Sequence, residues 1–246
     1  MKRCAISLGI NGPPAPNYPV AFSQNFPFGI ERLKEDLASV GSCGDFLFWN
    51  EHYPEGSPKE WEIHGAFKPF CFSEAAKAGY RLVLWLDASI RVKRPLDPLF
   101  DIIEKDGYLM FGEEHSIGEY CTDAAIEAFQ VTREASFRLP CCWSCVFGLD
   151  LENERSIEFL KQWKERAIDA KTFAGPKWSG FFGWPRTASL DSRVHGHREQ
   201  SVVSLIARKL GMEKFNERSL FRQYFDIDRD SVRLLKENYR DQGSRG

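Results

Sequence analysis

Long apolar runs are missing from this 246-residue chain. None approaches the roughly 18 residues that a bilayer-spanning helix needs. A basic excess is missing too, because 33 Lys and Arg residues face 35 Asp and Glu residues. A chain without surplus positive charge offers no general surface for polyanions. We therefore expect no membrane span and no nucleic-acid partner. The N-terminal apolar piece meets proline too early for a signal peptide.

Familiar nucleotide-binding and cysteine motifs are also absent. The turn from Gly9 to Gly12 lacks the G-x-G-x-x-G spacing, and it is not the phosphate loop of a P-loop enzyme. Seven cysteines are an odd number, and Cys142 and Cys145 have no second pair with which to complete a zinc site. We interpret the cysteines as buried free thiols, which fits a reducing, cytoplasmic compartment.

Strand and helix patterns alternate in the first part of the chain. The apolar run Leu82–Leu86, ended by Asp87, is typical of a strand buried on both faces. Apolar periodicity predicts earlier strands at 4–8 and 45–50, and helices at 29–40 and 64–77. This order predicts an α/β fold with a mostly parallel, Rossmann-like central sheet flanked by helices. The length fits a single domain.

The later elements are predicted in the same way. Strands are expected at 89–92, 108–111 and 142–149, and helices at 123–133 and 154–170, with a short helix ending at 104. A last clear helix opens within 195–200 and ends at Gly211. The Gly- and aromatic-rich stretch 174–185 predicts a loop, and 113–115 is also expected in a loop. The charged tail contains a short apolar patch at 220–227.

Three features carry possible chemistry. Asp87 directly follows a buried strand, where open α/β sheets place their ligands, and it could hold a divalent cation; the alternative is that it caps the next turn. Lys68 could bind phosphate, but a lone lysine favours a solvated surface. His195 and His197, with Glu199 and Gln200 in the following first helical turn, combine metal-ligand and base chemistry with free N–H groups. The alternative there is ordinary helix capping.

A family resemblance joins these features. The run LVLWLDASIRVKRPLDPLF from Leu82 resembles the strand–acid–strand element of glycosyltransferases with the GT-A fold. The run VHGHREQSVVSLIARKLG from Val194 resembles the H-R-x-D-Q-S element of several nucleotide-diphospho-sugar transferase-like families, and Trp143–Asp150 looks like the strand preceding the second half of the acceptor site. The match extends over residues 4–212. It implies one GT-A-like domain over 1–246, with a nucleotide-sugar-binding half (1–112), an acceptor half (113–214) and a charged C-terminal segment (215–246).

The resemblance implies a glycosyltransferase that moves a sugar from a nucleotide-diphosphate donor to a hydroxyl of a carbohydrate or glycoconjugate acceptor, with Mn²⁺ or Mg²⁺. Asp87 matches the first acid of a D-x-D motif and Ser89 takes the place of the second. His197 matches a late metal- or diphosphate-binding histidine, with His195 as the competing assignment. Glu199 matches the acid that would serve as base toward the acceptor. Substrate contacts are expected from Gly9, Ile10, Asn11, Lys68, Ser89, Gln200, Trp178 and Trp184.

Two points stay open at this stage. The aromatic loop that carries Trp178 and Trp184 could stack on sugars as a lid, or it could pack over the core. The serine at position 89 is a neutral substitute for an acid, so a catalytically weak or inactive GT-A-like module that binds nucleotide or sugar is the alternative function. An aspartyl phosphotransferase would need a second acid two residues after Asp87, which this chain lacks.

Overall fold

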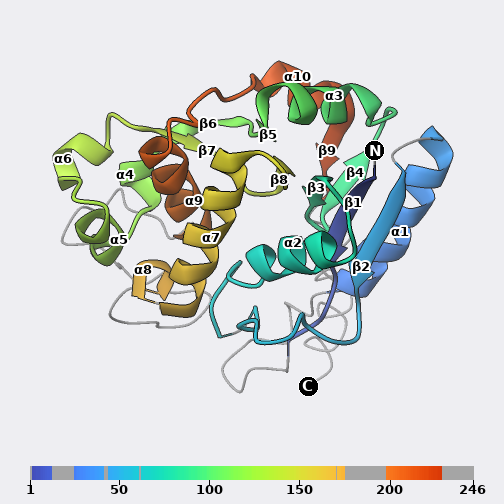
Figure 1. Ribbon diagram of the computed structural model, residues 1–246, viewed down its shortest axis with the longest axis horizontal. Coiled ribbons are helices and arrows are strands. Elements are labelled where there is room, and N and C mark those ends of the chain that lie inside the picture. Colours follow the sequence, from blue (N-terminus) through green and yellow to red (C-terminus); the bar gives the residue numbers. More distant parts are fainter. Residues whose placement is uncertain are drawn as a thin grey trace, which may run out of the picture.

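The central element is a five-stranded sheet with the order β2-β1-β3-β8-β5 (Figure 1). The computed structural model describes residues 2–12, 25–41, 44–60, 62–169, 171–174 and 198–228. The strands are β1 (Arg3–Leu8), β2 (Asp45–Trp49), β3 (Leu82–Leu86), β5 (Tyr108–Leu109) and β8 (Val146–Asp150). β1 pairs in parallel with β2 and β3, while β8 is antiparallel to both β3 and β5. The prediction of an α/β fold with a mostly parallel sheet is confirmed.

The chain reverses its winding direction at β1. Helix α1 (Phe26–Val40) connects β1 to β2, which lies on one side of β1 in the sheet. Helix α2 (Lys68–Lys77) connects β2 to β3, which lies on the other side of β1. The two helices cover different faces of the sheet. Neighbouring residues of a strand point to opposite faces, so they pack against different helices. Ala5 and Leu84 pack in one core with α1, while Ile6 and Trp85 pack in another with α2. A topological switch point therefore lies between the carboxyl ends of β1 and β3.

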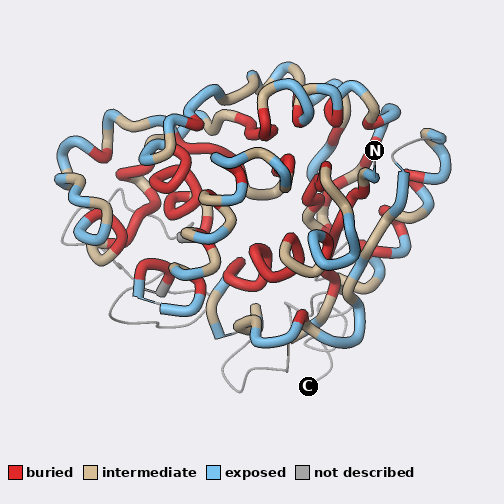
Figure 2. The backbone as a smooth tube through the Cα atoms, in the orientation of Figure 1, coloured by how far each residue is buried: buried red, intermediate tan, exposed pale blue. Residues whose placement is uncertain are grey.

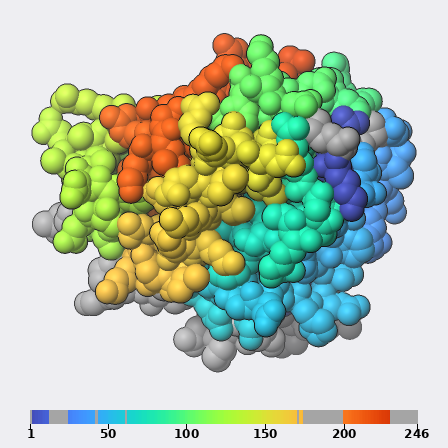
Figure 3. All heavy atoms as spheres, viewed as in Figure 1, coloured from blue at the N-terminus to red at the C-terminus, as the bar shows by residue number. Residues whose placement is uncertain are grey.

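The remaining helices extend these two layers. They are α3 (Asp97–Asp106), α4 (Ile117–Tyr120), α5 (Asp123–Ala128), α6 (Arg133–Ser136), α7 (Glu154–Asp169), α8 (Lys171–Ala174), α9 (Arg198–Lys209) and α10 (Arg218–Tyr224). Apolar residues of α3 and α10 join the core of α1, and those of α7 and α9 join the core of α2. Figure 2 shows α2 buried along most of its length, and Figure 3 shows α7 lying against it.

Two small sheets complete the fold. β4 (Ile90–Val92) pairs antiparallel with β9 (Phe225–Ile227), and β6 (Gly112–Ser116) pairs antiparallel with β7 (Pro140–Cys142). The apolar patch predicted at 220–227 proves to be α10 and β9, and its Phe221 and Phe225 are buried. The segment 225–227 thus lies beside the strand that follows Asp87.

Several predicted boundaries shift. The helix expected from residue 64 begins at Lys68, with Pro69 in its first turn, and the helix expected from residue 29 begins at Phe26, where Pro27 takes the first turn. The helix expected at 123–133 is divided by Gln130, whose φ is 55°. Residues 142–149 contain a break between β7 and β8, and 113–115 lie in β6 instead of a loop.

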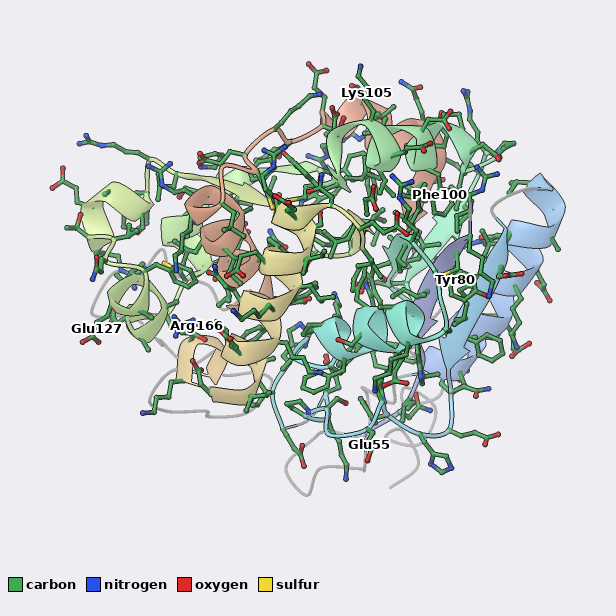
Figure 4. All side chains as sticks on the ribbon, viewed as in Figure 1. Glu55, Tyr80, Phe100, Lys105, Glu127 and Arg166 are labelled. Atoms are coloured by element: carbon green, nitrogen blue, oxygen red, sulfur yellow. The ribbon has the colours of Figure 1, made fainter. Side chains whose placement is uncertain are left out.

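Charged side chains such as the labelled Glu55, Lys105 and Glu127 are exposed at the periphery of the molecule (Figure 4). The six described cysteines are free, and all except the half-buried Cys145 are buried, so the interpretation of free thiols is confirmed for them. None of the helices in the described part of the chain has both the length and the apolar character needed to traverse a bilayer.

Candidate functional site

The carboxyl ends of β1 and β3 form the two sides of the candidate site. Gly9 follows β1, and its N–H donates to the Trp49 carbonyl of β2 at 2.8 Å. Asn11 Oδ1 accepts from the Phe26 N–H at 3.0 Å, which ties this loop to the start of α1. A Cβ at Gly9 would overlap Ile30 and the Phe26 carbonyl. Residues 9–11 are thus held at the carboxyl end of β1, next to the carboxyl end of β3.

Lys68 is the centre of the site. Its Nζ lies 2.9 Å from Asp87 Oδ1 and 3.0 Å from Glu199 Oε2. The same ammonium donates to the Ser144 carbonyl at 2.9 Å. Lys68 is only 4% exposed, so the expectation of a solvated surface position was wrong. The reason is that a crossover helix runs antiparallel to the strand it precedes, which puts the first residue of α2 at the carboxyl end of β3.

Glu199 enters the site from the first turn of α9 and is 2% exposed. Its Oε2 also accepts from Ser144 Oγ at 3.2 Å. Its Oε1 is buried without a hydrogen-bond partner among the described residues. Burial raises the pKa of the Glu199 carboxyl to about 7, since it disfavours the charged form; Asp87 adds to this effect and Lys68 opposes it. For Lys68, burial disfavours the charge, but the two carboxylates outweigh it and raise the pKa of the ammonium.

Asp87 is the most accessible of the three charged groups. Its side chain is 31% exposed, and Oδ1 accepts from Trp85 Nε1 at 2.6 Å. The backbone N–H of Asp87 donates to the Cys145 carbonyl of the neighbouring antiparallel strand region at 2.8 Å. Ser89 is half-buried on the same turn. A ligand approaching from solvent therefore reaches Asp87 before it reaches Lys68 or Glu199.

A second ion pair, which sequence reasoning missed, borders Glu199. His64 Nδ1 pairs with the carboxylate of Glu60, and Glu60 Oε2 accepts from the Gly65 N–H at 2.8 Å. The charge of Glu60 raises the pKa of His64 to about 9, and Glu199 adds to this shift while burial opposes it. Burial by itself would raise the pKa of Glu60, but the charge and hydrogen bond of His64 help to lower it below its ordinary value. The Glu60-x-x-x-His64 spacing was the available sequence signal.

Gly65 has no room for a side chain. Its φ is +73°, and a Cβ there would overlap the Glu199 carboxylate. We expect Gly65→Ala to lose about 1–2 kcal/mol from the left-handed backbone. Overpacking against Glu199 should cost about 1–3 kcal/mol more. Gly56 is the matched control, because its φ is +70° and nothing lies within 4 Å of its Cβ position. Equal losses for Gly56→Ala and Gly65→Ala in urea unfolding would contradict the contact with Glu199.

The Glu60–His64 pair also gives a pH prediction. Because the folded pKa of about 9 exceeds the ordinary 6.5, the pair's contribution to stability is complete below pH 6.5 and is lost as pH rises through about 9. His64 is half-exposed, so solvent weakens the contribution. NMR titration of the imidazole should show the raised pKa, and Glu60→Gln should lower it. A midpoint near 6.5 in the unmodified protein would contradict the pairing.

The other predicted site residues have different positions. Gln200 Nε2 donates to Glu113 Oε2 at 3.3 Å and to Cys141 Sγ at 3.6 Å, so its amide faces β6 and β7 instead of Lys68. His195, His197, Trp178 and Trp184 lie outside the described residues, as does most of the loop predicted at 174–185. Within the described ranges, no group of three or more His, Cys, Asp or Glu side chains is arranged to hold a metal ion.

Comparison with known proteins adds similar solved structures. No family model and no curated protein matches the chain. A glycosyltransferase involved in the glycosylation of the major capsid of PBCV-1 is 16% identical over 66% of this chain and 67% of that chain, with a TM-score of 0.38. The glycosyltransferase GlyE of Streptococcus pneumoniae TIGR4 is 15% identical over 88% and 45% of the two chains, with a TM-score of 0.40. This chain thus spans less than half of GlyE.

A Bacillus anthracis protein assigned as a glucose-1-phosphate thymidylyltransferase, in complex with sucrose, is also similar. It is 10% identical over 87% of this chain and 85% of that chain, with a TM-score of 0.37. All three TM-scores are below 0.5.

Proposed function

We propose that this chain binds a nucleotide-diphosphate sugar and transfers the sugar to a hydroxyl of a carbohydrate or glycoconjugate acceptor. The observation that carries the proposal is the buried Lys68, which bridges Asp87 and Glu199 at the carboxyl edge of a sheet with a switch point. Burying the charges of Lys68 and Glu199, with Asp87 partly exposed beside them, is costly for folding. Such an arrangement, with a strongly shifted pKa at the carboxyl ends of parallel strands, is typical of a functional site.

Each charged group has a distinct role in this proposal. Asp87 is accessible and faces the donor diphosphate, while residues 9–11 contact the nucleotide. An ammonium has three protons. Those of Lys68 match three acceptors, on Asp87, Glu199 and Ser144, so we assign Lys68 to holding the two carboxylates in place. Glu199 Oε1 accepts no hydrogen bond from the described residues, and the acceptor hydroxyl would supply the missing donor.

A divalent cation, Mn²⁺ or Mg²⁺, fits the proposal at Asp87. The carboxylate is partly exposed, and Ser89 adds a hydroxyl from the same turn. The cation would be held by these two side chains together with the donor's phosphate oxygens, with His197 as the further predicted ligand. When bound, it would neutralise the charge that develops on the diphosphate leaving group.

Glu199→Gln tests the role of the base. The amide retains an acceptor oxygen for Lys68 and Ser144 but cannot take a proton from an acceptor hydroxyl. We expect transfer to fall by about 10²-fold or more while donor binding changes little. Steady-state kinetics and calorimetric titration with the donor give the two quantities. An equal loss of transfer and donor binding would assign Glu199 to structure, and an unchanged transfer rate would remove it from the reaction.

One observation favours a second function. Lys68 and Glu199 are almost fully buried and pair with each other, and Ser89 replaces an acid, which suits a nucleotide- or sugar-binding module without turnover. A panel of UDP- and GDP-sugars, each with and without Mn²⁺, separates the two functions. Turnover of any donor supports the transferase. Saturable binding of UDP or GDP without hydrolysis or transfer supports the module, and absence of both contradicts the two proposals together.

A further inference from the structure

Arg32 holds the turn that carries Asp87 from the face of the sheet covered by α1. It is 5% exposed, and its Nη2 donates to the carbonyls of Ala88 at 3.0 Å and Ile90 at 3.4 Å. The Asp87 carbonyl in turn accepts from the Ile90 N–H at 2.9 Å. A guanidinium suits this task, because its planar fork places several donors at fixed angles.

Asp228 holds the same turn from the C-terminal part of the chain. Its backbone N–H donates to the Ser89 carbonyl at 2.8 Å, and its Oδ2 accepts from Arg32 Nη1 at 3.0 Å. The preceding strand β9 is paired with β4, with Ile227 opposite Ile90. Every carbonyl from residue 87 to residue 90 therefore has a donor, and two of the donor residues also bind each other.

The buried position of Arg32 is energetically costly, which indicates a role other than stability. A buried guanidinium loses hydration, and replacing a buried ion pair with apolar side chains of similar volume is often neutral or stabilising in proteins. Stability alone therefore does not require an arginine at position 32. Its contacts do specify one shape of the 87–90 turn, and that shape sets where the Asp87 and Ser89 side chains point.

We propose that Arg32 and Asp228 are positioning residues that hold the Asp87–Ser89 turn in the shape in which it meets the donor diphosphate. The part of this inference that concerns the donor rests on the proposed function. The clamp itself, defined as Arg32 and Asp228 with the carbonyls of residues 88–90, is independent of any ligand. The segment that includes Asp228 thereby supports a turn that belongs to the first half of the chain.

Backbone hydrogen exchange measured by NMR tests the clamp without a ligand. In Arg32→Met and in Asp228→Asn, the Ile90 and Asp228 amides should exchange about tenfold faster or more, because hydrogen bonds to a charged group are lost locally. Arg91→Met is the matched control. Arg91 lies in β4, directly after the turn, and also pairs with α1, with two hydrogen bonds of 2.8 Å to Asp36, but its guanidinium contacts Asp36 instead of the turn.

Calorimetric titration with UDP and GDP in the presence of Mn²⁺ tests the consequence for the site. The dissociation constant of the nucleotide that binds should rise about tenfold in Arg32→Met. It should change little in Arg91→Met. Arg32→Lys keeps the charge without the fork, so its binding should stay closer to that of Arg32→Met than to that of the unmodified protein.

The possible results separate the clamp from the proposed function. Unchanged exchange of the Ile90 and Asp228 amides in both clamp variants overturns the inference. Exchange that rises equally throughout β1, β3 and the turn also overturns it, because that result shows a purely structural role. If the unmodified protein binds neither UDP nor GDP, the proposed donor is wrong, and the exchange measurements alone decide whether the clamp exists.

Discussion

Lys68→Met is expected to destabilise this protein by about 3–5 kcal/mol, because it leaves the buried carboxylate of Glu199 and the partly exposed carboxylate of Asp87 without their shared cation. Methionine fills nearly the same space, so the change removes the charge and the three hydrogen bonds to Asp87, Glu199 and Ser144. Urea unfolding followed by circular dichroism measures the loss. Lys77→Met is the matched control, since Lys77 lies on the same helix, is exposed, and pairs with Glu74 three residues earlier. It should leave the urea midpoint unchanged.

Two further measurements identify the charge as the cause. Adding Glu199→Gln to Lys68→Met should restore part of the loss, with a coupling of about 0.5–3 kcal/mol. The loss should also grow with pH. Without Lys68 the pKa of Glu199 rises above its value of about 7, so the folded variant holds its proton to higher pH and keeps losing stability where the unmodified protein has stopped. A loss that is the same at pH 5 and pH 8 would contradict this account.

Asp87→Asn is expected to abolish donor turnover, with a fall of about 10²–10³-fold, while the fold stays intact. The asparagine oxygen can still accept from Trp85 and Lys68, but the side chain no longer has the charge that a cation–diphosphate donor requires. The variant leaves Lys68 and Glu199 as a balanced pair. The free energy of unfolding should therefore change by less than about 1 kcal/mol. Loss of the Asp87 charge should also lower the pKa of Glu199.

Turnover should be measured with the best donor from the nucleotide-sugar panel, next to a urea titration of the same sample. Asp226→Asn is a suitable control, because Asp226 lies on β9, next to the strand β4 that follows the Asp87 turn, and is exposed to solvent. It should keep full activity. If Asp87→Asn remains active, Asp87 does not bind the donor. If it unfolds, Lys68 and Glu199 do not form a stable pair without the charge of Asp87.

Local sequence patterns were enough to predict the sheet and one half of the site. The apolar run ending at Asp87 identified β3, because a strand buried on both faces must be continuously apolar. Strand and helix alternation predicted the mostly parallel sheet, and Asp87 and residues 9–11 follow two adjacent parallel strands at the same edge of that sheet. The first turn of α9 was also expected to carry Glu199. Each of these inferences depends on residues that are near one another in the chain.

The tertiary structure decided how these pieces meet. Lys68 was expected at the surface, and only the antiparallel packing of α2 on β3 brings it between Asp87 and Glu199. Gln200 is next to Glu199 in sequence, yet its amide faces Glu113, since neighbouring helical residues point in different directions. The burial that raises the pKa of Glu199 likewise exists only in the assembled core.

The clamp on the Asp87 turn shows why contacts between distant segments could not be predicted from the sequence. Arg32, the residues after Asp87, and Asp228 are separated by dozens of residues or more, and much of their contact runs through main-chain carbonyls. Every residue has such a carbonyl, so no residue type marks it as an acceptor. The sequence therefore determined which acid ends the central strand, through the local apolar pattern. Only the folded chain determined which cation neutralises that acid and which residues hold its turn, because packing of distant segments creates those contacts.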